Sequence, residues 1–80
     1  MNNPYLKIFN HFGQDAQIDK LLEEVHEFIE AIKSGDMAHA TEEYADVMVC
    51  MKQFRYAHKL DFEEIERIDR NKVIRTLDLS

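Results

Sequence analysis

Apolar residues recur every three or four positions through most of this chain, which is the period of an amphipathic α-helix. The pattern is clearest in one stripe, formed by Ile18, Leu21, Leu22, Val25, Phe28, Ile29 and Ile32. The chain has only two glycines and one proline, so strands and long loops are not expected. The pattern therefore predicts an all-α fold.

Capping residues divide the pattern into four helices. Asn3 and Pro4 are typical of a helix start, and Gly13 ends the helix that follows. Ser34-Gly35-Asp36 is predicted to end the second helix, turn the chain and cap the third helix. Asp61 is placed to cap the last helix. The predicted helices span about residues 4–12, 15–33, 37–58 and 62–79.

The predicted core is larger than a short chain can cover alone. Eighty residues allow one domain, which we expect to span 1–80, and a domain of this size buries only ~60–65% of its unfolded surface. Six residues of the third helix are expected to face inward: Ala40, Tyr44, Val47, Met48, Met51 and Phe54. The first and fourth helices are short or irregularly apolar. We therefore predict an antiparallel bundle of about four helices, whose core is completed in a homodimer or a dimer of dimers.

Composition narrows the class of partner. The formal charge of −6 and a pI near 5.1 argue against a nucleic-acid surface, which is usually basic. The N-terminus has no apolar signal segment, and no run approaches the ~20 apolar residues that cross a membrane. A single cysteine, Cys50, excludes an internal disulfide. We expect a cytoplasmic protein.

Two pairs of carboxylates carry the candidate chemistry. Glu24 and Glu27 are three positions apart on the second predicted helix, and Glu43 and Asp46 have the same spacing on the third, so each pair shares a helix face. Both pairs border an apolar stripe, where a carboxylate is costly without a partner. If the helices pack side by side, four hard oxygen ligands converge, as Mg²⁺ and a bound phosphate require. The alternative is an ordinary solvated acidic face.

Other polar residues extend these two rows. Gln17 and Lys20 continue the row of Glu24 on the second helix, and Cys50 and Gln53 continue the row of Asp46 on the third. Glu23 points more nearly to solvent. These rows predict a site for metal-dependent chemistry on a phosphorylated ligand.

In its acidic motifs, the chain resembles the MazG-like branch of the all-α nucleoside triphosphate pyrophosphohydrolases. The resemblance covers about residues 11–77, through Gln17-x-x-Lys20-x-x-Glu23-Glu24-x-x-Glu27, Glu42-Glu43-x-x-Asp46 and Lys72-x-x-Arg75-Thr76-Leu77. It implies hydrolysis of a (deoxy)nucleoside triphosphate to monophosphate and pyrophosphate, in dimers or dimers of dimers. It also implies Mg²⁺, with Mn²⁺ as a substitute, bound by four ligands: Glu24, Glu27, Glu43 and Asp46.

The resemblance suggests roles for five further residues. Glu23 fills the first position of the acidic motif and is expected to orient or activate water. Gln17 and Lys20 are expected to contact the substrate. Lys72 and Arg75, three apart on the last helix, are expected to hold phosphates, although the stem of Lys72 can also simply lie along an apolar surface. Because the chain ends soon after residue 79, any further element that closes the site is expected to come from a neighbouring subunit or to be absent.

Three alternatives stay open. Phosphoribosyl-ATP pyrophosphohydrolases have a similar acidic pattern near a turn like Gly35-Asp36. A helical homodimerisation module would keep the fold without catalysis, but it gains nothing from clustered like charges. A di-iron protein would use Glu23-x-x-His26, but the second half of that motif is missing. The histidines at 26, 39 and 58 are expected to be exposed or structural, and Cys50 to be a small core or near-site residue.

Overall fold

The computed structural model describes residues 2–79, so Met1 and Ser80, the two ends of the predicted 1–80 domain, lie outside it. Its four helices are α1 (Pro4–Phe12), α2 (Gln14–Ser34), α3 (Met37–Ala57) and α4 (Phe62–Leu79). Residues 2–79 contain no strand. The all-α prediction is confirmed, and each helix boundary lies within one residue of its predicted position. No helix in this part of the chain is both long and apolar enough to span a bilayer.

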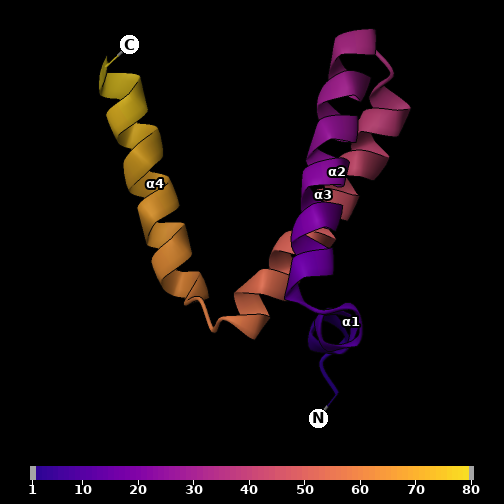
Figure 1. Cartoon of the computed structure of the whole chain (residues 1–80). Helices are drawn as coiled ribbons and strands as arrows, with labels where there is room; N and C mark the ends of the chain where they lie inside the picture. The colour runs from indigo at the N-terminus through magenta and orange to yellow at the C-terminus, as the bar shows by residue number, and fades with distance from the viewer. Residues whose placement is uncertain (1, 80) are drawn as a thin grey trace.

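Local capping explains where the helices begin and end. The Asn3 side-chain oxygen accepts the backbone N–H groups of Tyr5 and Leu6, at 3.0 and 3.3 Å. Gly35 ends α2 in the left-handed region, with φ of 78°, which an L side chain adopts only with strain. Asp36 then caps α3 by accepting the backbone N–H of residue 39. Because only two residues separate α2 from α3, these helices lie side by side as an antiparallel hairpin (Figure 1).

The α2–α3 contact is lined by polar and small residues. The side chains buried in it are Gln17, Glu24 and Ala31 on α2, and Ala40, Glu43, Cys50 and Gln53 on α3. Short side chains at Ala31 and Ala40 let the two backbones approach closely near the turn. The polar rows of the two helices therefore face each other, which is the packing that convergence of the carboxylates requires.

The large apolar residues lie mostly outside this contact. Tyr44, Met48 and Met51 are 58%, 42% and 53% exposed, so the prediction that they face inward is wrong for a single chain. Leu22 and Ile29 on α2 are likewise exposed. The reason is that α2 and α3 meet along the polar edges of their stripes, which turns the centres of the stripes outward.

Helix α1 crosses one end of the hairpin and is held there by aromatic contacts. The rings of Tyr5 and Tyr56 stack with centroids 5.6 Å apart, and Phe9 meets Phe54 edge-on at 5.4 Å. At this end of the hairpin, large apolar side chains of α1 and α3 pack against one another, as in an ordinary apolar core.

Helix α4 forms a second limb, so the chain has the shape of a V (Figure 1). At the vertex the Arg55 guanidinium lies 4.8 Å from the Tyr56 ring centre and 4.6 Å from that of Phe62. Asp61 begins α4 by accepting the N–H of Glu63 at 2.9 Å. The radius of gyration is 15.1 Å, against about 12 Å for a compact chain of this length. The two limbs therefore do not close on each other.

Candidate metal centre

Facing polar rows of α2 and α3 create a line of paired side chains. At one end, Gln17 Nε2 donates a hydrogen bond to Gln53 Oε1 at 2.7 Å, and both amides are buried. Further along α2, Lys20 Nζ lies 2.8 Å from Glu24 Oε1. Lys20 is half exposed while Glu24 is buried, so the lysine reaches in from the edge of the contact.

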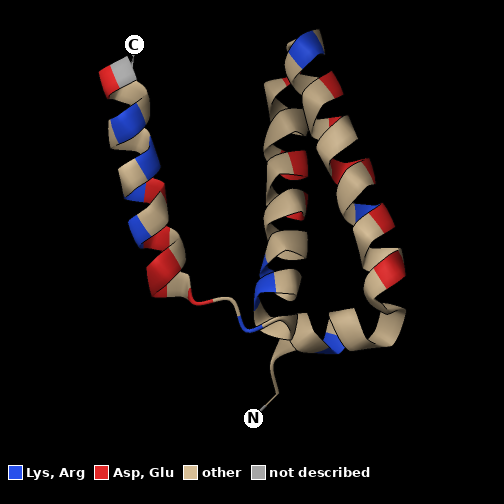
Figure 2. Cartoon of the chain, turned by 60° about the vertical axis from the view of Figure 1, so that its left-hand side comes forward, with Lys and Arg blue, Asp and Glu red and all other residues tan. Residues whose placement is uncertain are grey.

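Three carboxylates converge beyond this ion pair. One oxygen from each of Glu24, Glu43 and Asp46 lies within 4.8 Å of the other two. Figure 2 shows the acidic segments on the two facing helices of the hairpin. Three of the four predicted metal ligands are thus brought together by one antiparallel contact.

Two of these carboxylates are buried without complete hydrogen bonding. Glu24 and Glu43 are only 4% and 6% exposed, and the Oε2 atom of each is buried and has no hydrogen-bond partner. A buried carboxylate oxygen without a donor costs free energy unless a cation satisfies it. Carboxylate oxygens alone form the donor set, which suits a hard divalent cation such as Mg²⁺. The residues present therefore fit a metal ion.

The electrostatics of the cluster agree with its geometry. The neighbouring Glu24 carboxylate, together with burial, raises the pKa of Glu43 to about 7. Burial and Glu24 also raise the pKa of Asp46 above its ordinary value. The proximity of Glu43 and the adjacent Lys20 ammonium group lower the pKa of Glu24. These shifts are those of carboxylates crowded together, with Lys20 paired to one of them.

The fourth predicted ligand, Glu27, belongs to a second group of atoms. Its carboxylate, Glu43 and His39 each offer one ligand atom within 4.8 Å of the others. His39 Nε2 lies 3.7 Å from Glu43 Oε1. His39 is exposed, as expected, and its position four residues before Glu43 is the feature of the sequence that places it close to that carboxylate.

A cavity of about 530 Å³ opens beside the carboxylates. Its polar end holds Lys20, Glu23, Glu24 and Asp46; its other walls are Ile8, Phe12, Ala16, Gln17, Asp19, Val49, Cys50 and Gln53. Residues of α1 therefore supply an apolar wall at one end, while α2 and α3 supply charge at the other.

The sequence model of the MazG nucleotide pyrophosphohydrolase domain matches residues 12–77. The chain belongs to the MazG family. This confirms the resemblance stated from the acidic motifs, and the matched range contains every predicted site residue. No curated protein and no solved structure matches the chain.

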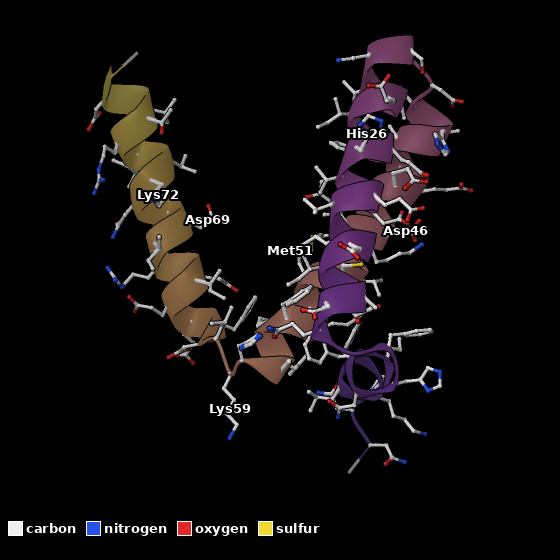
Figure 3. All side chains as sticks on the ribbon, viewed as in Figure 1. His26, Asp46, Met51, Lys59, Asp69 and Lys72 are labelled. Carbon is white, nitrogen blue, oxygen red and sulfur yellow. The ribbon has the colours of Figure 1, made fainter. Side chains whose placement is uncertain are left out.

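Not every predicted site residue of this MazG chain lies at the cluster. Lys72 and Arg75 are on α4, and Lys72 lines a shallow groove formed by α4 residues alone, such as Ile68 and Val73. Figure 3 shows Lys72 on one limb of the V and Asp46 on the other, on the side of the hairpin away from α4. Within one chain the structure therefore does not bring the predicted phosphate-binding pair to the carboxylates.

Glu23, His26 and Cys50 are the remaining candidate residues. Glu23 is exposed at the rim of the cavity, as its helix position predicted. Neither Glu23 nor His26 belongs to a group of convergent ligand atoms among residues 2–79, so the di-iron alternative gains no support. Cys50 is buried beside the cluster, and burial together with Glu24 raises the pKa of its thiol, which keeps it protonated and unreactive.

Proposed function

We propose that this MazG protein is a Mg²⁺-dependent nucleoside triphosphate pyrophosphohydrolase, which releases nucleoside monophosphate and pyrophosphate. The observation that carries this proposal is the pair of buried, unpartnered Oε2 atoms of Glu24 and Glu43. In a purely structural helix a buried carboxylate oxygen without a hydrogen-bond donor only costs free energy, whereas in a metal site such an oxygen can bind the cation. Membership of the MazG family supports the same reaction class.

The proposed ligands of the Mg²⁺ ion are Glu24, Glu43 and Asp46; Glu27, the fourth proposed metal ligand, lies in the neighbouring group of ligand atoms that also contains Glu43. Mg²⁺ held there, or Mn²⁺ in its place, would neutralise charge on the phosphoryl oxygens and lower the pKa of bound water. Glu23, exposed at the rim, is proposed to accept a proton from the attacking water or to orient it.

The rest of the cavity fits the remainder of a nucleotide. Lys20 is proposed to contact a phosphate, since its side chain is half exposed and its ammonium group lies beside Glu24. The buried Gln17–Gln53 pair lies between the charged end and the apolar wall. Amide groups at that position suit the polar edge of a base, and the Phe12 ring suits its face. We therefore assign the base to the α1 end of the cavity.

The phosphoribosyl-ATP alternative rested partly on the Gly35-Asp36 turn. In the structure this dipeptide ends α2 and caps α3. A purely structural role accounts for both residues, so the turn carries no information about the substrate. The homodimerisation module without catalysis is disfavoured by the unpartnered carboxylate oxygens.

The decisive experiment is incubation of the purified protein with a panel of ribo- and deoxyribonucleoside triphosphates and Mg²⁺, followed by identification of the products. We expect monophosphate and pyrophosphate in equal amounts. Glu24→Gln should reduce the rate by orders of magnitude. Glu30→Gln is the matched control, because Glu30 is an exposed acid on the same helix paired only with Lys33 at 3.8 Å, and its rate should stay at the wild-type level. Release of inorganic phosphate, or no hydrolysis of any nucleotide, would overturn the proposal.

A further inference from the structure

A nitrogen donor lies next to the carboxylate cluster. His39 is on the first turn of α3, where the Asp36 cap holds its backbone N–H at 3.1 Å. Its side chain lies over Glu43, with Nε2 3.7 Å from Oε1. Glu27 reaches the same point from α2, so that one ligand atom from each residue falls within 4.8 Å of the others.

This group is separate from the group formed by Glu24, Glu43 and Asp46, and only Glu43 belongs to both. Glu43 is buried between the two groups, and its Oε2 atom has no hydrogen-bond partner. Its other oxygen, Oε1, is the atom that lies 3.7 Å from His39 Nε2. Its burial and its unpartnered oxygen point to a ligand, which an exposed pair of oppositely charged residues would not require.

There is also room for an ion and its water molecules. A surface cavity of about 410 Å³ is lined by His26, Glu27, Glu30, Ala31, Ser34 and His39. Of these lining residues, Ala31 is buried. A metal held by three protein ligands here would keep positions open to solvent.

The donor types of the two groups differ in chemical preference. Three carboxylates suit Mg²⁺, whereas a histidine nitrogen adds affinity for first-row transition metals and little for Mg²⁺. We propose that His39, Glu27 and Glu43 form a second metal position selective for a divalent transition-metal ion, adjacent to the Mg²⁺ position and sharing Glu43 with it. The inference rests on the proposed function only for the identity of the ion at the first position.

Co²⁺ is a suitable probe because its visible absorption reports nitrogen and oxygen ligands directly. Co²⁺ is titrated into the full chain without nucleotide, in millimolar Mg²⁺ that saturates the all-oxygen position. We expect one Co²⁺ ion per chain to bind and to resist displacement by Mg²⁺. In His39→Asn the Co²⁺ affinity should fall by at least about tenfold, because loss of a direct ligand should cost at least as much as loss of a group that only orients one.

Two variants make the result specific. His26→Asn is the matched control: His26 lines the same cavity but lies outside the group of convergent atoms, so its Co²⁺ affinity should stay unchanged. Asp46→Asn alters only the all-oxygen position, so it should retain Co²⁺ binding while losing nucleotide hydrolysis. Circular dichroism checks that each variant is folded.

The outcomes separate the two proposals. Equal Co²⁺ affinity in the wild type and His39→Asn, or complete displacement of Co²⁺ by Mg²⁺, overturns the second metal position even if the protein hydrolyses nucleotides. Co²⁺ binding that depends on His39, in a protein that hydrolyses no nucleotide, supports the second position and leaves the pyrophosphohydrolase proposal refuted.

Discussion

Glu43 is the residue on which both groups of ligand atoms depend. It is buried, lies beside Glu24, and carries one oxygen without a partner. Its pKa is raised to about 7, so near neutral pH the metal-free protein holds a carboxylate that resists ionisation. Stability and function therefore conflict at this side chain: the charge that binds a metal is unfavourable when no metal is present.

This conflict predicts the pH dependence of stability. Because the folded-state pKa of Glu43 is above its unfolded value of 4.5, its stabilising contribution is fully present below about pH 4.5 and is lost as the pH rises through about 7. Glu43→Gln, which imitates the protonated acid, should match the wild type at pH 4.5 and melt at a higher temperature than the wild type at pH 8, both without metal.

Thermal melts of both proteins in chelator and in millimolar Mg²⁺ test this. Mg²⁺ should raise the melting temperature of the wild type at pH 8 and leave Glu43→Gln nearly unchanged, since only a ligand of the folded state stabilises it. The exposed Glu30→Gln variant should show no difference of this kind. A melting difference between the wild type and Glu43→Gln that stays constant with pH would contradict the account of the cluster.

The Gln17–Gln53 pair makes a second prediction at the residue scale. Gln17→Leu leaves the Gln53 carbonyl without its donor in a buried position, which should cost about 1–3 kcal/mol of unfolding free energy. The double variant Gln17→Leu/Gln53→Leu removes both partners and should recover most of that loss. Urea denaturation of the wild type, Gln17→Leu, Gln53→Leu and the double variant measures this coupling.

Nucleotide kinetics then distinguish a structural role of the Gln17–Gln53 pair from a role in binding the base. If the pair reads the base, the double variant should be stable yet show a raised KM and weaker discrimination among bases. Unchanged discrimination would leave the pair with a structural role only.

At the scale of the elements, α2 and α3 build the carboxylate cluster and α1 builds the opposite wall of the cavity. Helix α4 contributes nothing to this site within one chain, although it carries Lys72 and Arg75. If these basic residues hold phosphates, they must do so at the site of another copy of the chain. Arg75→Ala is then expected to weaken catalysis strongly while leaving Mg²⁺ binding intact, and Arg75→Lys to recover little, because lysine cannot form bidentate contacts.

Mixed oligomers decide whether Arg75 acts between chains. Glu24→Gln and Arg75→Ala should each be inactive alone. When they are refolded together, a mixed dimer contains one site with intact carboxylates facing an intact Arg75 from the other chain. About a quarter of wild-type activity should return. If Arg75 acts within its own chain, every site in the mixture has one defect and no activity returns.

At the scale of the whole molecule, one chain leaves too much surface exposed. It presents 6473 Å² to solvent, whereas a folded monomer of this mass is expected to present about 5,000 Å². The excess is larger than the roughly 800 Å² that each partner buries in a standard interface. Much of it is apolar, since Leu22, Ile29 and Met51 are among the large exposed residues.

A second copy of the chain can bury the exposed apolar residues of α2 and α3. We therefore predict a stable dimer or a dimer of dimers. Sedimentation at micromolar concentration should find no folded monomer. Ile29→Glu, at a position 43% exposed in the single chain, should dissociate the oligomer and reduce helicity. Asn10→Glu adds the same charge on exposed α1 and should change neither property. A folded wild-type monomer would contradict the prediction.

The sequence by itself determined the helices and the composition of their faces. Caps such as Asn3 and Gly35 act within a few residues of the chain, and a period of 3.6 fixes which side chains share a face, so both are local properties. The acidic spacing on α2 and α3 is local in the same sense. For that reason the sequence could single out the carboxylates of Glu24, Glu43 and Asp46, which the structure brings together, whereas the pairing of Gln17 with Gln53 required the fold.

Tertiary structure decided which faces meet. Periodicity alone suggested that Tyr44, Met48 and Met51 would be buried within the chain, but α2 and α3 pack along their polar edges instead. Only that packing brought His39 to Glu27, because the two residues lie on opposite sides of the turn between the helices. The separation of α4 from the carboxylate cluster could not be predicted from local sequence patterns either. It depends on the angle between the two limbs of the V, which the helix propensities of single residues do not determine.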